Sequence, residues 1–221
     1  MLTVPAIPLP ATDDSMGRAA EALREGLVVA LPTDTVYGLA VDPRRPGAVE
    51  RLFALKERPM EVALPVLVGS REQVDVVARP LDSVAEHLAV RYWPGPLTLV
   101  VPRRYGFTAD LGGPPSARQT VGVRWADHAV VQSLCHRLGP LAVTSANLHG
   151  APPATTAHQV ASSFTGAEAP VVIVDGGTCG GIPSTVVECR GLASRCLREG
   201  AIPWDELVEE PRGEWSVDTS R

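Results

Sequence analysis

Short apolar runs alternate with segments of helical periodicity along most of this chain. The run at 27–31 is apolar at every position, and a run without alternation is typical of a strand buried on both faces. Similar or alternating runs predict further strands at 64–68, 97–101, 120–124, 141–144, 171–174, 184–188 and 195–198. Apolar residues at helical spacing predict helices at 13–25, 46–56, 70–78, 82–91, 129–138 and 154–163.

The order of these elements predicts the fold class. Strands and helices interleave over most of the chain, whereas the last three strands follow closely on one another. We therefore expect an α/β fold with a mixed parallel and antiparallel sheet flanked by helices. No shift in composition divides the chain, so we expect one domain over 13–208, preceded by a proline-rich arm at 1–12 and followed by a polar tail at 209–221.

The composition narrows the class of protein. Lys and Arg number 20 against 25 Asp and Glu, and a formal net charge of −5 disfavours general nucleic-acid binding, which depends on neutralising phosphates. The four cysteines show no CxxC pairing and no histidine at zinc-ligand spacing, so we expect free thiols and no metal site built by the protein. No apolar window approaches ~20 residues and the N-terminus lacks a signal-peptide pattern, so we expect a cytoplasmic protein with no membrane partner.

Small polar groups follow several of the predicted strands. Hydroxyl, amide and guanidinium groups can hydrogen-bond carboxylate, ribose and phosphate, and open α/β sheets bind ligands at strand ends. The groups in question are Thr33, Asp34, Thr35, Arg124, Ser145, Asn147 and Ser184. Each has a structural alternative, because Ser145 or Asn147 can cap a helix and Arg124 can form a surface ion pair.

Two cations stand at the end of the helix predicted at 46–56. Pro59 should stop that helix, which places Lys56 and Arg58 beside a loop where they could meet phosphate or simply answer the helix dipole. The chain has no GxxxxGK[ST], GxGxxG or GxSxG motif and no obvious pair of nucleophile and base. An enzyme of this kind would act by positioning reactants and neutralising charge, as nucleotidyl transfer often does.

Seven motifs occur in order along the chain: PTDTVYGLA, LKERP, WPGPLTLVV, TVGVR, TSANLHG, PSTVVEC and LREGAI. Together, over residues 19–202, they resemble the YrdC-like family, whose best-known members are L-threonylcarbamoyl-adenylate synthases. The resemblance implies a single α/β domain with a twisted mixed sheet around a basic concave cavity. It also implies the short form of the family, without the second domain of its larger members.

The resemblance implies an activity as well. L-threonine would take up bicarbonate or CO2 to form a carbamate, and the carbamate oxygen would attack the α-phosphate of ATP and release pyrophosphate. Mg2+ would bridge the phosphates of ATP. A downstream transferase would then use the threonylcarbamoyl-adenylate to make t6A in tRNA, a scheme that also allows a weak contact between the synthase and tRNA.

Site residues carry over from the motifs position by position. Threonine would be bound by Thr35, Arg124 and Ser184, with the guanidinium clamping the amino-acid carboxylate. Lys56 and Arg58 would be the catalytic cations beside the ATP phosphates. The other nucleotide contacts would be Thr120, Ser145, Asn147, Thr155 and Arg198.

A few positions depart from the family pattern. Leu67 stands where some synthases carry a histidine, and residues 60–62 offer no further basic or polar group that matches the family. Two alternatives therefore stay open: a carbamoyl-adenylate enzyme with another acceptor, and an RNA-binding or ribosome-associated module without catalysis. Asp34 has no assigned role, and Tyr37 and Gly38 are expected to shape a turn.

Overall fold

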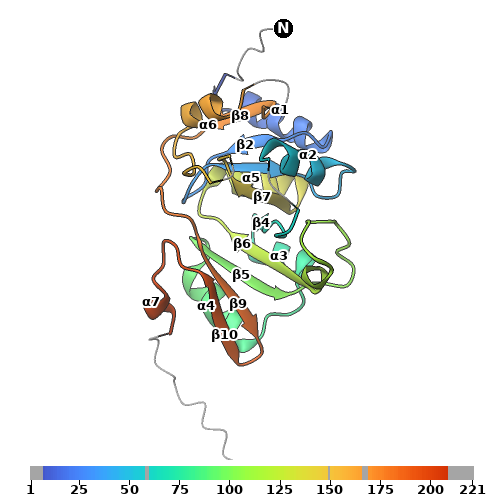
Figure 1. Cartoon of the computed structure of the whole chain (residues 1–221), viewed down its shortest axis with the longest axis vertical. Coiled ribbons are helices and arrows are strands. Elements are labelled where there is room, and N and C mark those ends of the chain that lie inside the picture. The colour runs from blue at the N-terminus through green and yellow to red at the C-terminus, as the bar shows by residue number, and fades with distance from the viewer. Residues whose placement is uncertain (1–6, 58–59, 149, 166–168, 209–221) are drawn as a thin grey trace, which may run out of the picture.

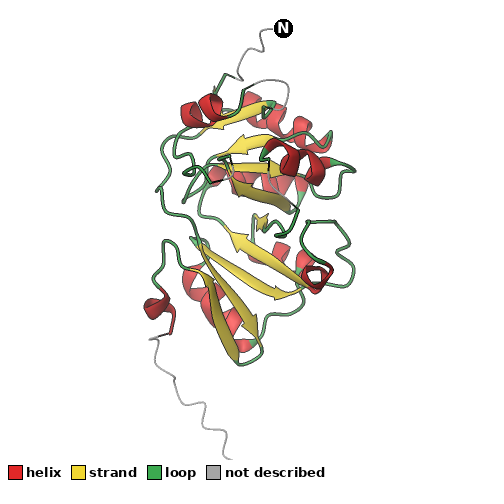
Figure 2. Cartoon of the chain, in the orientation of Figure 1, coloured by secondary structure: helices red, strands yellow, loops and turns green. Residues whose placement is uncertain are grey.

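A long mixed sheet runs through the molecule and carries helices on both faces (Figures 1 and 2). The computed structural model describes residues 7–57, 60–148, 150–165 and 169–208. The strands of these residues are β1 (Leu9–Pro10), β2 (Val29–Leu31), β3 (Gly38–Val41), β4 (Val66–Val68), β5 (Leu97–Pro102), β6 (Thr120–Trp125), β7 (Leu141–Ser145), β8 (Val172–Asp175), β9 (Thr185–Arg190) and β10 (Ala193–Arg198). The helices are α1 (Asp13–Arg24), α2 (Ala48–Leu55), α3 (Arg71–Val77), α4 (Ser83–Tyr92), the 3-10 helix η1 (Pro115–Gln119), α5 (Ala129–Leu138), α6 (Ala157–Ser163) and α7 (Trp204–Val208).

The strands form one sheet in the order β1-β8-β2-β3-β7-β4-β6-β5-β9-β10. Parallel pairing joins β1 to β8, β2 to β8, β4 to β6 and β5 to β9, and the remaining neighbours are antiparallel. The short connections from β2 to β3 and from β9 to β10 impose antiparallel pairing, whereas parallel strands need longer crossovers. The expected single α/β domain with a mixed sheet is confirmed.

One central strand is not apparent from the sequence pattern. Two residues separate β3 from the TDT turn at 33–35, and all four residues of this strand are buried between β2 and β7. Four apolar residues behind a turn are too few to display a period, so the pattern favours a continuing loop there. The pattern likewise gives no sign of α7.

The ends of the chain add one structural element to the predicted outline. Within the segment expected to form an arm, Leu9–Pro10 form β1 and pair in parallel with β8. Residues 1–6 and the tail expected at 209–221 lie outside the described residues. In the described part of the chain, no helix is both long and apolar enough to cross a membrane.

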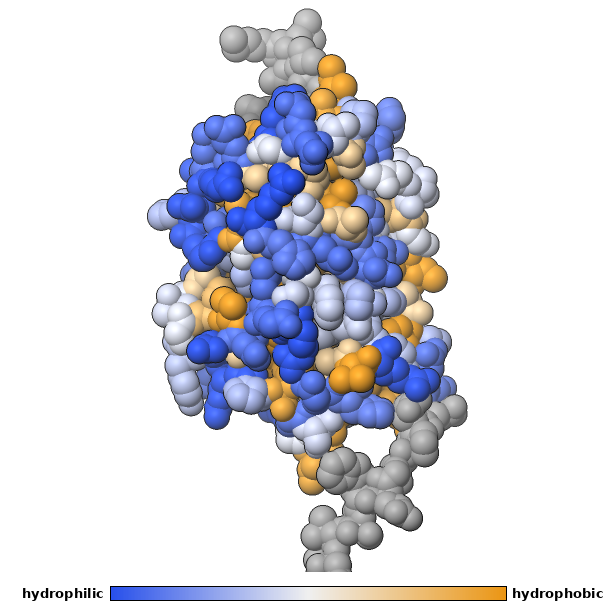
Figure 3. Space-filling model, turned by 180° about the vertical axis from the view of Figure 1, so that it is seen from behind, coloured by the Kyte–Doolittle hydropathy of each residue, from blue (hydrophilic) through white to orange (hydrophobic). Residues whose placement is uncertain are grey.

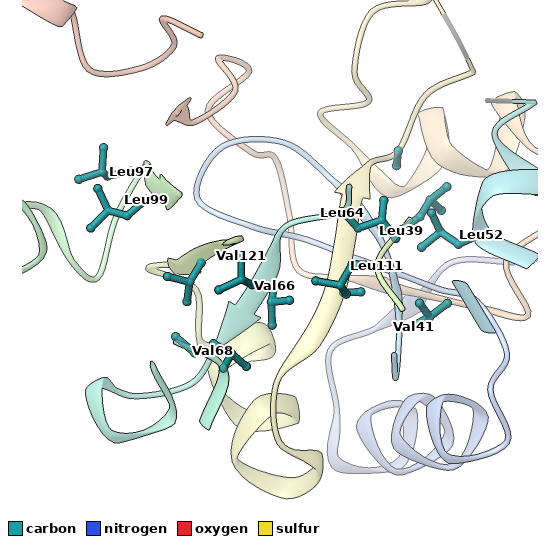
Figure 4. Packing of buried hydrophobic residues seen from close by; sticks show 14 of the residues in the cluster. Leu39, Val41, Leu52, Leu64, Val66, Val68, Leu97, Leu99, Leu111 and Val121 are labelled. Atoms are coloured by element: carbon teal, nitrogen blue, oxygen red, sulfur yellow. The ribbon is translucent and has the colours of Figure 1, made fainter. Parts of the chain in front are cut away.

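Apolar side chains pack against both faces of the sheet. Alternation along β2 sends Val29 and Leu31 to a cluster with α1 and α5, and Ala30 to a larger cluster with α2. Figure 4 shows part of the larger cluster, in which Leu39 and Leu52 lie close together. On the outer surface seen in Figure 3, apolar residues form separate patches among hydrophilic ones. The buried layers hold the central strands from both sides.

Gly38 permits a close approach between strands rather than a turn. A Cβ built on Gly38 would lie 2.6 Å from Val143 Cγ1 on β7, and the β-branched Val143 cannot rotate away at low cost. We expect Gly38→Ala to lower the free energy of unfolding by about 1–3 kcal/mol in urea titrations. Gly17→Ala in α1 is the matched control, because no atom lies within 4 Å of its Cβ, and it should be neutral or stabilising. Equal urea midpoints of unfolding for Gly38→Ala and Gly17→Ala would contradict this packing.

Candidate active site

A cavity of about 550 Å³ lies on one face of the sheet. Alternation along the strands builds it: in β5, Leu97 enters the core while Thr98 and Val100 line the cavity. In β6, Val123 is a core residue, and Arg124 lines the cavity. Thr98 and Arg124 thus reach the cavity from strands, whereas Thr35 and Ser184 reach it from the segments that precede β3 and β9.

The predicted polar groups lie at or beside strand ends but not at one edge of the sheet, since Ser145 is the last residue of β7 and Ser184 directly precedes the first residue of β9. Thr120 is the first residue of β6 and Arg124 lies within the same strand, yet both line the cavity. Because β3–β7, β7–β4 and β6–β5 are antiparallel pairs, the strands beside the cavity do not all end at one common carboxyl edge. The site residues are therefore brought together by the lining of the cavity and not by one edge of the sheet.

The guanidinium of Arg124 is held from three sides. Its Nε donates to Gly95 O at 3.0 Å, one terminal nitrogen to Thr35 Oγ1 at 2.9 Å, and the other to Asp34 Oδ1 at 2.5 Å. Arg124 is only 6% exposed. Burial lowers the pKa of Arg124, and the Asp34 carboxylate opposes that effect. The fork is therefore fixed in one orientation at the cavity wall.

The hydroxyl of Thr35 lies between Thr33 and Arg124. Thr33 Oγ1 donates to Val36 O at 2.6 Å and accepts from the backbone N–H groups of Thr35 and Val36. Thr33 Oγ1 also lies 3.0 Å from Thr35 Oγ1. Thr35 accepts from Arg124, and a hydroxyl oxygen has a second lone pair that can accept from a ligand.

Ser184 joins two further cavity residues. Its hydroxyl lies 2.9 Å from Thr98 Oγ1, and both side chains are buried. Arg198 donates to Ser184 O at 2.7 Å and to Ser184 Oγ at 3.2 Å. A residue expected at the threonine and one expected at the nucleotide are therefore in direct contact.

Lys56 connects with the end of β7. Its Nζ donates to Ser145 O at 2.5 Å and to Asn147 Oδ1 at 3.3 Å, and Ser145 Oγ donates to the same Asn147 oxygen at 2.6 Å. Lys56 is 3% exposed and is the single lysine of the sequence. Since α2 ends at Leu55, the helix stops just before this cation, as Pro59 predicts.

The structure unites most of the predicted site residues. The cavity is lined by Thr35, Thr120, Arg124, Ser145, Ser184 and Arg198. Lys56 and Asn147 reach it through their contacts with Ser145. Thr155 does not line the cavity: its hydroxyl donates to Gln159 Oε1 at 3.0 Å, just before α6. Arg58 lies outside the described residues.

Two polar residues of the site have no role in the sequence-based assignment. Asp34 forms the ion pair with Arg124, and Thr98 contacts Ser184. A lone hydroxyl within the apolar LTLVV run was an available signal for Thr98. No sequence signal pairs Asp34 with Arg124, because the two are 90 positions apart.

The charges of the cavity favour an anionic ligand. Among its described lining residues there are arginines but no Asp or Glu. In the described residues no group of three or more His, Cys, Asp or Glu side chains could hold a metal ion. A divalent ion in this cavity would depend mainly on oxygens supplied by a ligand and water.

Tyr37 ties the TDT turn to β8 and the segment after it. Its hydroxyl donates to Gly177 O at 2.9 Å and lies 3.3 Å from Asp175 Oδ1, and the ring is fully buried. The pKa of Tyr37 is raised to about 12, mainly by burial; the Gly176 N–H opposes this rise, and the nearby Asp175 carboxylate adds to it.

This shift predicts a loss of stability at alkaline pH. An unfolded tyrosine ionises near pH 10, so the stabilisation is complete below that pH and is lost as pH rises through about 12. We expect the free energy of unfolding to fall by about 2–3 kcal/mol from this group over that window, as measured by urea titration. Tyr37→Phe should flatten the fall, and an unchanged pH slope in that variant would refute the assignment.

The fold and the site together define an α/β protein with a mixed sheet and a cavity whose lining carries arginines and hydroxyl groups. Comparison with known proteins makes the assignment specific. The chain belongs to the Sua5/YciO/YrdC family, whose model, described as "Telomere recombination", matches residues 21–200.

Several members of the family are similar over most of this chain. Threonylcarbamoyl-AMP synthase of Pyrococcus abyssi is 40% identical over 191 residues, which cover 86% of this chain and 55% of the relative. The Bacillus subtilis enzyme of that name is 36% identical, over 90% of this chain and 57% of the relative. The chain thus spans about half the length of these two relatives. The crystal structure of P. abyssi Sua5 complexed with L-threonine superposes with a TM-score of 0.79 at 35% identity, covering 93% of this chain and 61% of that one.

Proposed function

We propose that this protein is an L-threonylcarbamoyladenylate synthase, a nucleotidyltransferase that makes threonylcarbamoyl-AMP and pyrophosphate from L-threonine, bicarbonate or CO2, and ATP. The observation that carries the proposal is the buried Arg124 fork in the same cavity as the cluster of Lys56 and Ser145. The names of the two similar synthases and the threonine bound by P. abyssi Sua5 support it.

Threonine would bind at Arg124. Three of the five N–H groups of its guanidinium donate to Gly95, Thr35 and Asp34, and the other two have no acceptor among the described residues. A carboxylate can accept from such a fork. The acceptor lone pair of Thr35 suits an amine or carbamate N–H, and Ser184 supplies a further hydroxyl in the same cavity.

ATP would occupy the part of the cavity next to Lys56. This ammonium group and Arg58 would offset the charge of the phosphates in a partly desolvated site, where such charges act strongly. The nucleotide would contact the polar groups carried over from the motifs that line or adjoin the cavity: Thr120, Ser145, Asn147 and Arg198.

The chemistry requires no nucleophile from the protein. The amine of threonine and bicarbonate give a carbamate and water, and the carbamate oxygen then forms a bond to the α-phosphorus. The bond from that phosphorus to the bridging oxygen breaks, and pyrophosphate leaves with the electron pair. Mg2+ would enter on the phosphates of ATP, because the described cavity lining offers no carboxylate and this ion readily retains water ligands.

The product is an activated carbamoyl group on AMP, which suits transfer to an amine. A downstream transferase would take it to make t6A in tRNA. The reaction belongs in the cytoplasm, where its substrates and tRNA are found together.

An omission assay tests the proposal. Pyrophosphate release should require ATP, L-threonine and bicarbonate together, and should fall to background when any one is left out. Equal rates with another amine in place of threonine would favour the alternative acceptor. Salt-sensitive RNA binding without pyrophosphate release under any combination would favour the module without catalysis.

A further inference from the structure

A second groove adjoins the cavity. It has a volume of about 1300 Å³ and lies between the end of β5, the loop that follows β5, η1 and the end of β9. The two hollows share Val100, Ala117, Thr120 and Leu197 in their walls. A ligand in the groove would therefore lie next to a ligand in the cavity.

The groove is basic although the chain is acidic overall. Its lining includes five arginines and two carboxylates, Asp110 and Glu188. Glu188 is already paired with Arg190 at 2.6 Å and with Arg195 at 2.9 Å. The negative charge of Glu188 is therefore offset by Arg190 and Arg195, and it does not neutralise the other arginines of the groove.

Four arginines of the groove form no ion pair within the described residues: Arg79, Arg103, Arg104 and Arg118. Arg103 is held by the carbonyl groups of Phe107 and Ala109, so it serves the loop itself. Burial lowers the pKa of Arg103, Asp110 raises it, and the neighbouring cation Arg118 lowers it again. Arg79 and Arg118 are exposed and remain available to an anion.

An exposed aromatic ring lies beside these cations. Tyr105 is 86% exposed, and the Arg79 guanidinium stands 5.3 Å from the centre of its ring. This cation–π contact orients the ring. Exposed rings set among arginines are a common surface for stacking nucleobases, while the cations meet the phosphates.

We propose that this groove binds a nucleotide unit, with Arg79 and Arg118 at the phosphate and Tyr105 stacked on the base. The unit is either a free nucleotide or part of a single RNA strand. This site adjoins the cavity, with which it shares Thr120 and three other wall residues, and does not depend on the reaction proposed there.

Fluorescence anisotropy with a short fluorescein-labelled oligouridylate tests the proposal, since uracil differs from the adenine expected in the cavity. Arg118→Gln and Tyr105→Ala should each weaken binding by roughly fivefold or more, and Arg118→Gln should also reduce the salt dependence by about one phosphate contact. Arg18→Gln is the matched control, because Arg18 is exposed on α1 and does not line the groove. Melting curves check that every variant folds.

Competition distinguishes the two sources. Displacement of the probe by uridine monophosphate at a similar concentration of nucleotide units indicates a free nucleotide, and much weaker displacement indicates an RNA strand. Three results would overturn the proposal. The first is that the oligouridylate does not bind at low salt, and the second is that Arg18→Gln weakens its binding as much as Arg118→Gln does. The third is that tripolyphosphate binds as tightly as the oligouridylate and that Tyr105→Ala does not weaken the binding of tripolyphosphate. The binding assay contains no threonine or bicarbonate, so its result can be interpreted even if the synthase assay shows no activity.

Discussion

Replacing Arg124 by alanine is expected to raise the threonine concentration for half-maximal pyrophosphate release by roughly a hundredfold. The substitution removes the only described guanidinium that is fixed in the cavity wall by both Thr35 and Asp34. The KM for ATP should change much less, because the cation expected at the phosphates is Lys56. Steady-state kinetics with each substrate varied in turn measure both effects.

Two further variants separate recognition from folding. Arg124→Lys keeps the charge but loses the planar fork, so it should recover little of the threonine affinity. Asp34→Asn keeps a hydrogen-bond acceptor for Arg124 and removes the negative charge, so it should bind threonine far better than Arg124→Ala does. If Arg124→Ala keeps the threonine KM of the parent protein, the guanidinium does not hold the amino acid.

Replacing Lys56 by methionine is expected to lower kcat for pyrophosphate release by roughly a hundred- to a thousandfold. Methionine keeps the unbranched stem of the side chain but cannot offset the charge that develops on the phosphates. The threonine KM should stay within a few-fold of the parent value, because Arg124 is untouched. A kcat close to that of the parent would exclude Lys56 from the reaction.

The sequence provides a direct control for that variant. Because Lys56 is the only lysine, an amine-reactive reagent can modify only this side chain and the terminal amine. Peptide mass mapping should show that ATP slows the modification of Lys56 and that threonine alone does not. Modification at the same rate with and without ATP would place the phosphates elsewhere.

Local patterns in the sequence predict the elements that are long enough to show a period. The helix expected at 129–138 is α5 (Ala129–Leu138), since Val131, Leu134 and Cys135 all face the core. Periodicity does not predict β3, because this strand is short and follows a turn rich in polar groups. Periodicity therefore fixes much of the α/β class, while short central strands depend on pairing partners elsewhere.

In the site, too, the sequence predicts individual residues but not how they are brought together. The motifs identify Thr35, Arg124 and Ser184, and the structure brings all three into one cavity. The face on which they meet depends on the strand order and on the antiparallel pairs, neither of which can be read from local sequence. The partner of Arg124 is missed for the same reason, because Asp34 is far away along the chain.

Mass spectrometry of the product formed from 13C-bicarbonate tests the central claim most directly. We predict a compound that contains AMP, threonine and one labelled carbon, formed in step with pyrophosphate and absent when bicarbonate is excluded. An adenylate of threonine without the labelled carbon, or AMP joined to some other labelled amine in preference to threonine, would contradict the account.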